Sequence, residues 1–349
     1  MRSTGRWATI TTTTALGVLV AAPALACGGL VGANGTIELV RTTTLSAYTD
    51  GVQRYVTAFE FSGAGEEVGA IIPLPDIPTD VVRAGDWTLQ RLVREVAPEL
   101  EQFALAGGDD AATDESAEVL LETEVDALDL TVLRGGGDEV GRWAVDNGFF
   151  LTPDAPEILD FYAARSEIFL AAKFDASRAA DLGQNAGDST PIMLTIPTDQ
   201  PWVPLRILSM GLEGGKQVEA DVFLLTEQRP QLLAGGRGLA LNRSEAASST
   251  LLADLRSDVG MEWVPEQMWL THLELSTPAD ALTYDLAVST DPQVHPSLDD
   301  VGVELASAAV PVEPARTPAD WWPVAVAVAV GYVAWLWTRA IRRQSLGPS

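Results

Sequence analysis

The chain has 349 residues, 22 Lys and Arg against 49 Asp and Glu, a formal net charge of −27, one cysteine and two histidines. One cysteine excludes an intramolecular disulfide, and so few Cys and His residues argue against a zinc site. The acidic balance argues against a nucleic acid as partner, because phosphates repel such a surface and counterion release requires Lys and Arg. Hydrophobic residues make up 47% of the chain, which is typical of a globular protein rather than a disordered one.

The first 26 residues have the layout of a secretory signal peptide, with a short basic region followed by an apolar stretch over 8–22. Ala24 and Ala26 place small side chains where a signal peptidase requires them, so we expect cleavage after Ala26. Cys27 would then be the first residue of the mature chain. Three states of Cys27 fit this pattern: an unmodified first residue, a lipid-modified cysteine, and a thiol that pairs with another chain.

A second apolar segment, residues 321–338, contains no charged residue and carries tryptophans at both ends. It is long enough to cross a bilayer, and aromatic residues are typical of the two interfaces. The basic tail 339–349 follows directly, and basic flanks stay in the cytoplasm. We therefore expect a single-pass protein of the cell membrane, with its N-terminal domain outside and the lipid bilayer as partner through 321–338. A buried core helix and a cleaved sorting signal are the alternatives.

Between these segments we expect one exported domain over 27–296 and a stalk over 297–320, where Pro311, Pro314 and Pro318 favour extended backbone. All 49 acidic residues but only 17 basic ones fall in this portion, which gives it a net charge of −32. Such a surface is soluble but repels itself, and high salt or divalent cations would relieve the repulsion. A plain solvated surface is the simpler interpretation.

The patterns within the exported domain predict a strand-rich α+β fold with a few short helices, in addition to the C-terminal transmembrane helix. A hairpin is predicted over 42–61 around Asp50-Gly51, a strong turn signal, and a short apolar strand over 68–74. Apolar residues at helical spacing predict a helix over 87–103 that Pro98 kinks or ends.

Further along the chain, alternating residues predict a strand over 124–133. Asp138 is placed to cap a second helix, and a third is predicted over 156–165. A last helix over 245–257 is predicted to begin at a capping Ser244. The remaining predicted strands are 167–173, 190–196, 203–209, 217–226, 267–276 and 283–289.

Residues 142–174 resemble a run typical of the bacterial domain-of-unknown-function 2330 family. The matching positions are Trp143, Asn147-Gly148-Phe149, Pro153, Tyr162 and Lys173. Cys27-Gly28-Gly29, the apolar strand that ends at Pro73 and Pro75, and the stretch 191–209 are similar to the same family, although the family's usual Trp before Pro73 is aliphatic here. The resemblance implies a secreted or membrane-anchored bacterial protein without an established activity, and it transfers no active site.

The sequence contains no nucleophile elbow, Walker loop or zinc-protease motif, so we assign no catalytic and no cofactor-binding residue. His272 lies in a predicted strand, where a packed or surface histidine is expected rather than a base. Calcium is the one metal worth considering, with Asp109, Asp110, Asp114 and Glu115 as weak candidate ligands in an acidic loop. Their spacing does not match a helix–loop–helix calcium site, and a solvated loop is the simpler interpretation.

These observations favour an uncharacterised extracytoplasmic interaction or sensory module that contacts another envelope protein and is not an enzyme. The first alternative is an exported hydrolase that attacks envelope polymers with paired carboxylates. Among 49 acidic residues some pair always stands at a suitable separation, so the pattern does not discriminate. The second alternative is a purely structural component of the envelope.

Overall fold

The computed structural model describes residues 29–32, 41–60, 68–96, 117–149, 151–184, 189–302 and 313–314. The signal-peptide positions Ala24, Ala26 and Cys27 lie outside these residues. The four calcium candidates at 109, 110, 114 and 115, the segment 321–338 and the tail 339–349 also lie outside them. Within the described ranges, no helix is both long and apolar enough to cross a membrane.

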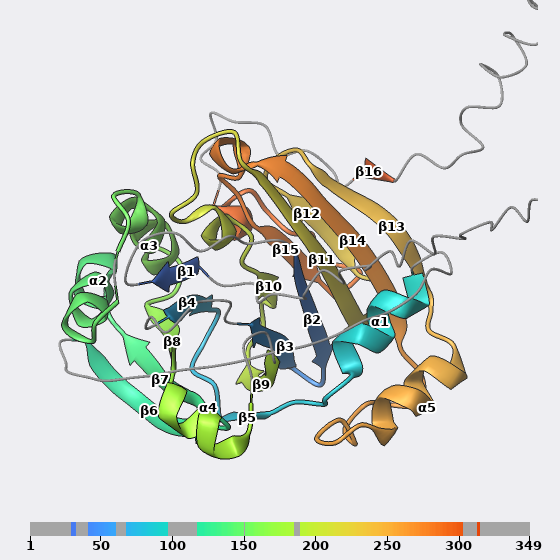
Figure 1. Ribbon diagram of the computed structural model, residues 1–349. Helices are drawn as coiled ribbons and strands as arrows, with labels where there is room; N and C mark the ends of the chain where they lie inside the picture. Colours follow the sequence, from blue (N-terminus) through green and yellow to red (C-terminus); the bar gives the residue numbers. More distant parts are fainter. Residues whose placement is uncertain are drawn as a thin grey trace, which may run out of the picture.

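The larger layer of the molecule is a mixed sheet of eight strands in the order β16-β13-β14-β11-β2-β3-β9-β5 (Figure 1). Neighbouring strands are antiparallel, except that β2 runs parallel to β11 and β16 runs parallel to β13. The strands are β2 (Thr42–Thr49), β3 (Val52–Glu60), β5 (Asp80–Arg83), β9 (Ser189–Pro197), β11 (Gln217–Thr226), β13 (Leu239–Ala246), β14 (Trp269–Pro278) and β16 (Glu313–Pro314).

The predicted hairpin over 42–61 is formed by β2 and β3, with Thr49 opposite Val52. Asp50 and Gly51 both adopt positive φ angles, 52° and 71°, as a two-residue hairpin turn requires. The sequence signal was sufficient here because the turn and both strands are local.

A second, five-stranded antiparallel sheet has the order β1-β4-β8-β7-β6. Its strands are β1 (Gly29–Gly32), β4 (Val68–Leu74), β6 (Glu118–Val125), β7 (Leu128–Arg134) and β8 (Ile168–Phe174). The prediction of one strand over 124–133 was wrong, because the chain reverses at Asp126, whose φ is 52°. Val125 and Leu128 lie opposite each other and are both buried. The alternation of residues that predicted a single strand therefore continues through the turn.

A third sheet of three short strands has the order β10-β15-β12, with β10 (Trp202–Val203), β12 (Gln231–Ala234) and β15 (Leu286–Ser289). The prediction of a strand over 203–209 was wrong beyond Val203, because a 3₁₀ turn, η1 (Arg206–Ser209), follows. Pro204 has no N–H, and the N–H groups of Leu205 and Arg206 donate to a carboxylate instead of a neighbouring strand.

The α-helices of the described residues are α1 (Thr88–Val96), α2 (Gly137–Asp146), α3 (Ala155–Ala163), α4 (Ala176–Leu182) and α5 (Ser249–Ser257); short 3₁₀ turns η2 (Ala279–Ala281) and η3 (Asp299–Val301) follow later in the chain. Asp138 does not cap α2. The N-cap residue is Gly136, whose N–H donates to the side-chain carboxylate of Glu139 at 2.9 Å. Ser244 lies within β13, and Ser248 caps α5 instead, accepting from the N–H of Leu251 at 3.1 Å.

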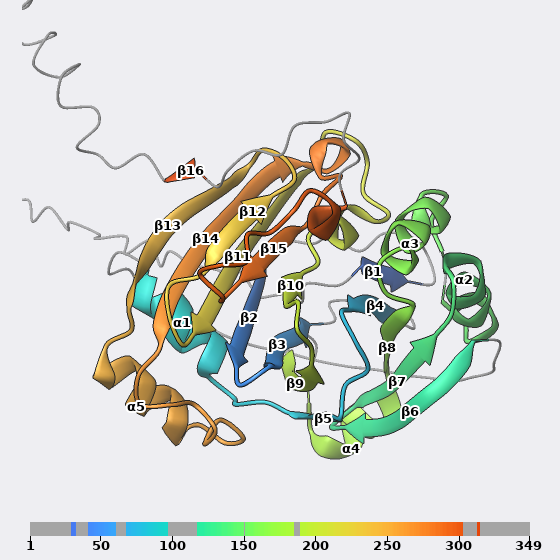
Figure 2. The same cartoon turned by 180° about the vertical axis from the view of Figure 1, so that it is seen from behind.

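Two hydrophobic clusters lie on opposite faces of the eight-stranded sheet. The inner cluster joins this sheet to the other two sheets and to α2 and α3, and the outer cluster joins it to α1 and α5. Strand β11 serves both, since Val222 belongs to the inner cluster and Phe223 to the outer. Figure 2 shows α1 and α5 at one end of the molecule and α2 and α3 at the other.

Candidate functional site

Among the described residues of this acidic protein, three aspartates are buried: Asp221, Asp258 and Asp285 expose 6%, 2% and 0% of their surface. A buried carboxylate is strongly destabilising unless hydrogen bonds and positive charge compensate it. These three positions are therefore the first places to look for chemistry in the described part of the chain.

Asp285 lies just before β15 and joins three separate segments. Its Oδ1 accepts from the Tyr162 hydroxyl at 2.8 Å and from the N–H groups of Leu205 at 2.7 Å and Arg206 at 3.0 Å. Its Oδ2 forms an ion pair with Arg165. These four donors occupy the carboxylate, so Asp285 fixes α3, the β10–η1 turn and β15 relative to one another.

The donors around Asp285 are themselves held in place. The Arg165 guanidinium lies 4.3 Å from the ring centroid of Trp202, and its Nη1 donates to the carbonyl of Asp300 at 3.1 Å. Burial raises the pKa of Tyr162 well above its usual value, and the neighbouring carboxylate of Asp285 adds to the effect. Tyr162 therefore remains a protonated donor.

Asp221 is the centre of a second cluster, on the face of the eight-stranded sheet that carries α1 and α5. Arg41 donates through Nε to Oδ2 at 2.5 Å and through Nη2 to Oδ1 at 2.8 Å. Nη2 of Arg41 also donates to Glu274 at 2.9 Å. Burial alone would raise the pKa of Asp221, but the hydrogen bonds from Arg41 and His272 hold it below its usual value.

His272 is buried on β14, where the sequence placed it in a strand. Its Nε2 lies 2.8 Å from Oδ1 of Asp221, and its ring stacks on Phe223 with centroids 4.6 Å apart. Nδ1 of His272 has no hydrogen-bond partner within the described residues. The geometry is that of a packed histidine that hydrogen-bonds a buried carboxylate, whose charge Arg41 compensates.

Asp258 caps a helix from a distant segment. Its Oδ2 accepts from the N–H of Trp87 at 3.0 Å and from the Thr88 hydroxyl at 2.8 Å, and its Oδ1 accepts from the N–H of Asp86 at 3.1 Å. Gly85 allows this approach, because a Cβ there would lie 2.2 Å from Oδ2. Asp258 thus satisfies the donors at the start of α1 in place of a local cap.

Residues that carry the family resemblance meet in the five-stranded sheet and α2. Nζ of Lys173 donates to the carbonyl of Asn147 at 2.9 Å, and the Asn147 side chain donates to the carbonyl of Trp143 at 2.9 Å. The rings of Trp143 and Phe149 lie 5.9 Å apart. All of these residues are buried, so the resemblance marks a packing motif rather than an exposed site.

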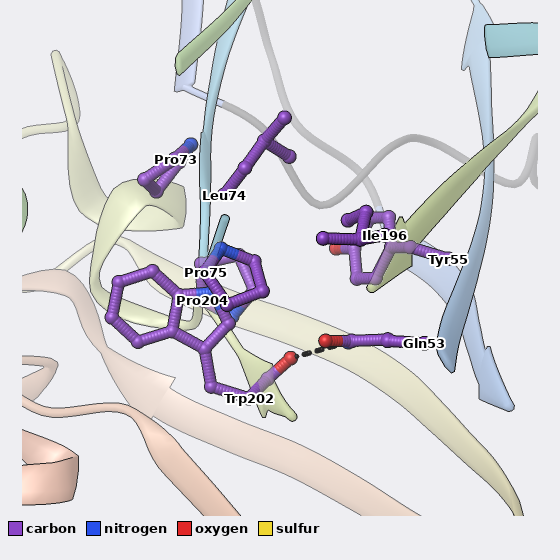
Figure 3. A pocket seen from close by; sticks show the side chains of 8 residues that line it. All are labelled: Gln53, Tyr55, Pro73, Leu74, Pro75, Ile196, Trp202 and Pro204. Atoms are coloured by element: carbon purple, nitrogen blue, oxygen red, sulfur yellow. Dashed lines mark hydrogen bonds between the residues drawn. The ribbon is translucent and has the colours of Figure 1, made fainter. Parts of the chain in front are cut away.

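A small pocket lies where the three sheets meet (Figure 3). Gln53 is fully buried beside it, and its Nε2 donates to Ser46 at 2.8 Å and to the carbonyl of Trp202 at 2.8 Å. The space between these side chains does not admit a water-sized sphere, whereas small-molecule sites usually hold about 300–1,000 Å³. The lining residues are Gln53, Tyr55, Pro73, Leu74, Pro75, Ile196, Trp202 and Pro204. The pocket therefore marks the place where the three sheets pack against one another.

Strand β6 forms one edge of the five-stranded sheet and, among the described residues, pairs only with β7. Its exposed side chains are glutamates: Glu118 pairs with Arg134 at 3.2 Å, and Glu124 lies 3.6 Å from Arg178. Glu122, between them, has no ion pair within the described residues. As far as the structure describes the chain, this edge combines unpaired backbone with three exposed glutamates, two of which lie beside arginines.

The predicted calcium candidates lie outside the described residues, and no group of three or more His, Cys, Asp or Glu within those residues is placed to hold a metal. Sequence reasoning missed the three buried aspartates. A signal was present for two of them, since Asp221 and Asp285 are charged residues within otherwise apolar strands or strand ends. Their partners are far away in sequence and gave no signal.

Comparison with known proteins places the chain in a family. No curated protein matches the chain. The crystal structure of baculovirus P35 has a TM-score of 0.37 and 8% identity, covering 82% of this chain and 100% of its own. A mutated baculovirus P35 after caspase cleavage has a TM-score of 0.34 and 7% identity, covering 70% and 95%. Likeness at this level carries no argument about fold or function. The model of a family described as an uncharacterized protein conserved in bacteria (DUF2330) matches residues 21–235, more than half of the chain, and the protein belongs to that family.

Proposed function

We propose that this protein is an extracytoplasmic interaction module, anchored in the cell membrane by residues 321–338, that binds an extended basic segment of another envelope protein along β6. The layout of residues 1–26 and 321–338 supports export and anchoring. The observation that carries the binding role is the glutamate-bearing edge of β6, which pairs with no second strand among the described residues.

A strand edge offers a row of N–H and C=O groups to an incoming strand. On β6, Leu121 and Thr123 lie opposite the buried residues Val132 and Leu130, so this face points into the protein. Glu122 and Glu124 point to the other face, which is exposed. An added strand would gain backbone hydrogen bonds from the edge and contact these two glutamates with its own alternating side chains.

Charge defines the partner that this edge would select. Glutamates two residues apart on a strand are roughly 7 Å apart, the spacing of alternate side chains in an added strand. Lys or Arg at alternate positions would pair with them, at about 0.2–1 kcal/mol for each cross-strand pair. An acidic segment would be repelled by the edge and by the net charge of the domain.

The same geometry weighs against the hydrolase alternative. Enzymes that use carboxylates keep them in sites where an oxygen can reach the substrate. The most buried acids here, Asp258 and Asp285, each accept hydrogen bonds from several protein donors. Their roles are therefore structural, and recognition through a surface edge is the better supported function.

The test uses the full chain in detergent micelles and two labelled peptides, one alternating Lys with Val and one alternating Glu with Val. We expect fluorescence anisotropy to detect binding of the Lys peptide and not of the Glu peptide. The charge reversal Glu122→Lys with Glu124→Lys should weaken binding about tenfold, which corresponds to about 1.4 kcal/mol.

A control variant separates strand recognition from general attraction to an acidic protein. Glu262→Lys with Glu266→Lys changes the net charge by the same amount at two exposed positions away from β6. This variant should bind the Lys peptide as the parent chain does. Equal weakening by both variants, or no binding of the Lys peptide at millimolar concentration, would contradict the proposal.

A further inference from the structure

The C-terminal part of the chain returns to the eight-stranded sheet. Residues Glu313 and Pro314 form β16, which pairs in parallel with Ala240 and Leu241 at the outer edge of β13. The last described residue before β16 is Gly302. The chain is therefore attached to the body of the protein at a second point, eleven residues beyond Gly302.

This second attachment shortens the link to the proposed membrane segment. Six residues separate Pro314 from residue 321, where the apolar segment begins. Fully extended, this length of chain spans at most about 25 Å. If Gly302 were the last attachment, the link to residue 321 would span up to roughly 65 Å.

The size of the domain decides what these lengths allow. A domain of about 270 residues has a radius of gyration of roughly 18 Å, and a sphere of that size is about 48 Å across. A link of about 65 Å would let any face of the domain turn toward the bilayer. A link of about 25 Å is shorter than the domain is wide, so the side opposite the attachment cannot reach the bilayer.

Strand β6 lies at the end of the molecule away from β13 and β16 in both views (Figures 1 and 2). We infer that the pairing of β16 with β13 holds this edge of the eight-stranded sheet against the lipid surface and directs β6 away from the membrane. The inference rests on the proposed membrane anchor and would place the proposed binding edge where an envelope partner can reach it.

The test measures orientation on liposomes that contain the full chain. A fluorescent non-canonical amino acid replaces either Glu245 on β13 or Glu122 on β6, and both glutamates are exposed. The lipid headgroups carry a fluorescent acceptor, so the energy transfer from each position reports its distance from the bilayer. We expect energy transfer to be at least about twofold greater from position 245 than from position 122, because the two positions lie at different heights above the bilayer.

Two insertions of the same 18-residue Gly-Ser linker test whether β16 sets this orientation. Placed after residue 317, the linker lengthens the chain between β16 and the membrane and should abolish the difference between the two positions. Placed after residue 306, it lies before β16 and should leave the difference intact. If both insertions have the same effect, or if the parent chain shows equal transfer from both positions, the inference is wrong.

Flotation of the same liposomes separates the two proposals. A chain that floats with the lipid but shows no difference in transfer contradicts the orientation alone. A chain that does not float contradicts the membrane anchor and the orientation together. Peptide binding at β6 is measured in micelles and does not depend on either result.

Discussion

Asp258 accepts a hydrogen bond from the hydroxyl of Thr88 at 2.8 Å, across 170 residues of sequence. The same carboxylate accepts from the N–H of Trp87, so the start of α1 is capped by a residue at the far end of α5. Helix α1 and helix α5 cover the same face of the eight-stranded sheet. This contact therefore fixes two helices whose packing defines the outer hydrophobic cluster.

Replacement of Asp258 by Ala should lower the free energy of unfolding by about 2–3 kcal/mol, because several donors at the start of α1 lose their acceptor in a buried place. Ser248→Ala, which removes the ordinary local cap of α5, is the control and should cost about 1 kcal/mol. Urea denaturation of both variants measures the difference. Equal losses would show that Asp258 acts as an ordinary cap only.

Gly85→Ala tests the same contact from the other side. The new Cβ would stand 2.2 Å from Oδ2 of Asp258, so either the carboxylate or the backbone must move. We expect the free energy of unfolding to fall by about 1–3 kcal/mol, as it does at other overpacked sites. Only part of the loss should disappear in the Asp258→Ala background, because the Thr88 hydroxyl oxygen, 2.6 Å from the new Cβ, remains, and a double-mutant cycle measures this coupling.

Tyr162→Phe removes the hydroxyl that donates to Asp285 and accepts from the N–H of Ile207 at 2.9 Å. Both partners are buried, so we expect a loss of about 1–3 kcal/mol. Tyr48→Phe is the matched control, because its hydroxyl donates to the carbonyl of Thr198 in a more exposed place. The free energy of unfolding should fall by less than about 1 kcal/mol in Tyr48→Phe, and chemical denaturation compares the two variants.

Local signals in the sequence were sufficient for a large part of the fold. The hairpin at Asp50-Gly51 and the strand over 217–226 were predicted with their observed bounds or close to them, because turn chemistry and residue alternation determine them. The errors have distant causes. The η1 turn replaces a predicted strand because its N–H groups donate to Asp285, about 80 residues later in the chain.

The buried clusters show the same limit. An aspartate within an apolar strand such as β11 indicates a compensating partner, but the sequence does not say which residue supplies it. For Asp221 the partner is Arg41, 180 residues away, brought alongside by the parallel pairing of β2 with β11. The order of the strands in the sheet, which no local sequence pattern encodes, therefore determines where these buried charged clusters form.

The pH dependence of stability should reveal the cluster around Asp221. Hydrogen bonds from Arg41 and His272 hold the pKa of Asp221 below its usual value, despite burial. The bond from Asn242 and then that from Arg41 hold the pKa of Glu274 low as well. A carboxyl with a lowered pKa in the folded state stabilises the fold fully above its unfolded pKa of about 4, and this contribution is lost as the pH falls through the folded value.

We therefore compare the parent chain with Asp221→Asn, because the many exposed acids also titrate and their effect is common to both. The difference in free energy of unfolding should be constant above about pH 5 and should shrink progressively below about pH 4. Urea denaturation from pH 3 to pH 7 measures it. Asp254→Asn, at a partly exposed ion pair with Arg91, should show a smaller difference that changes less with pH. A difference for Asp221→Asn that is independent of pH would contradict the assignment of Asp221 as the charged centre of the cluster.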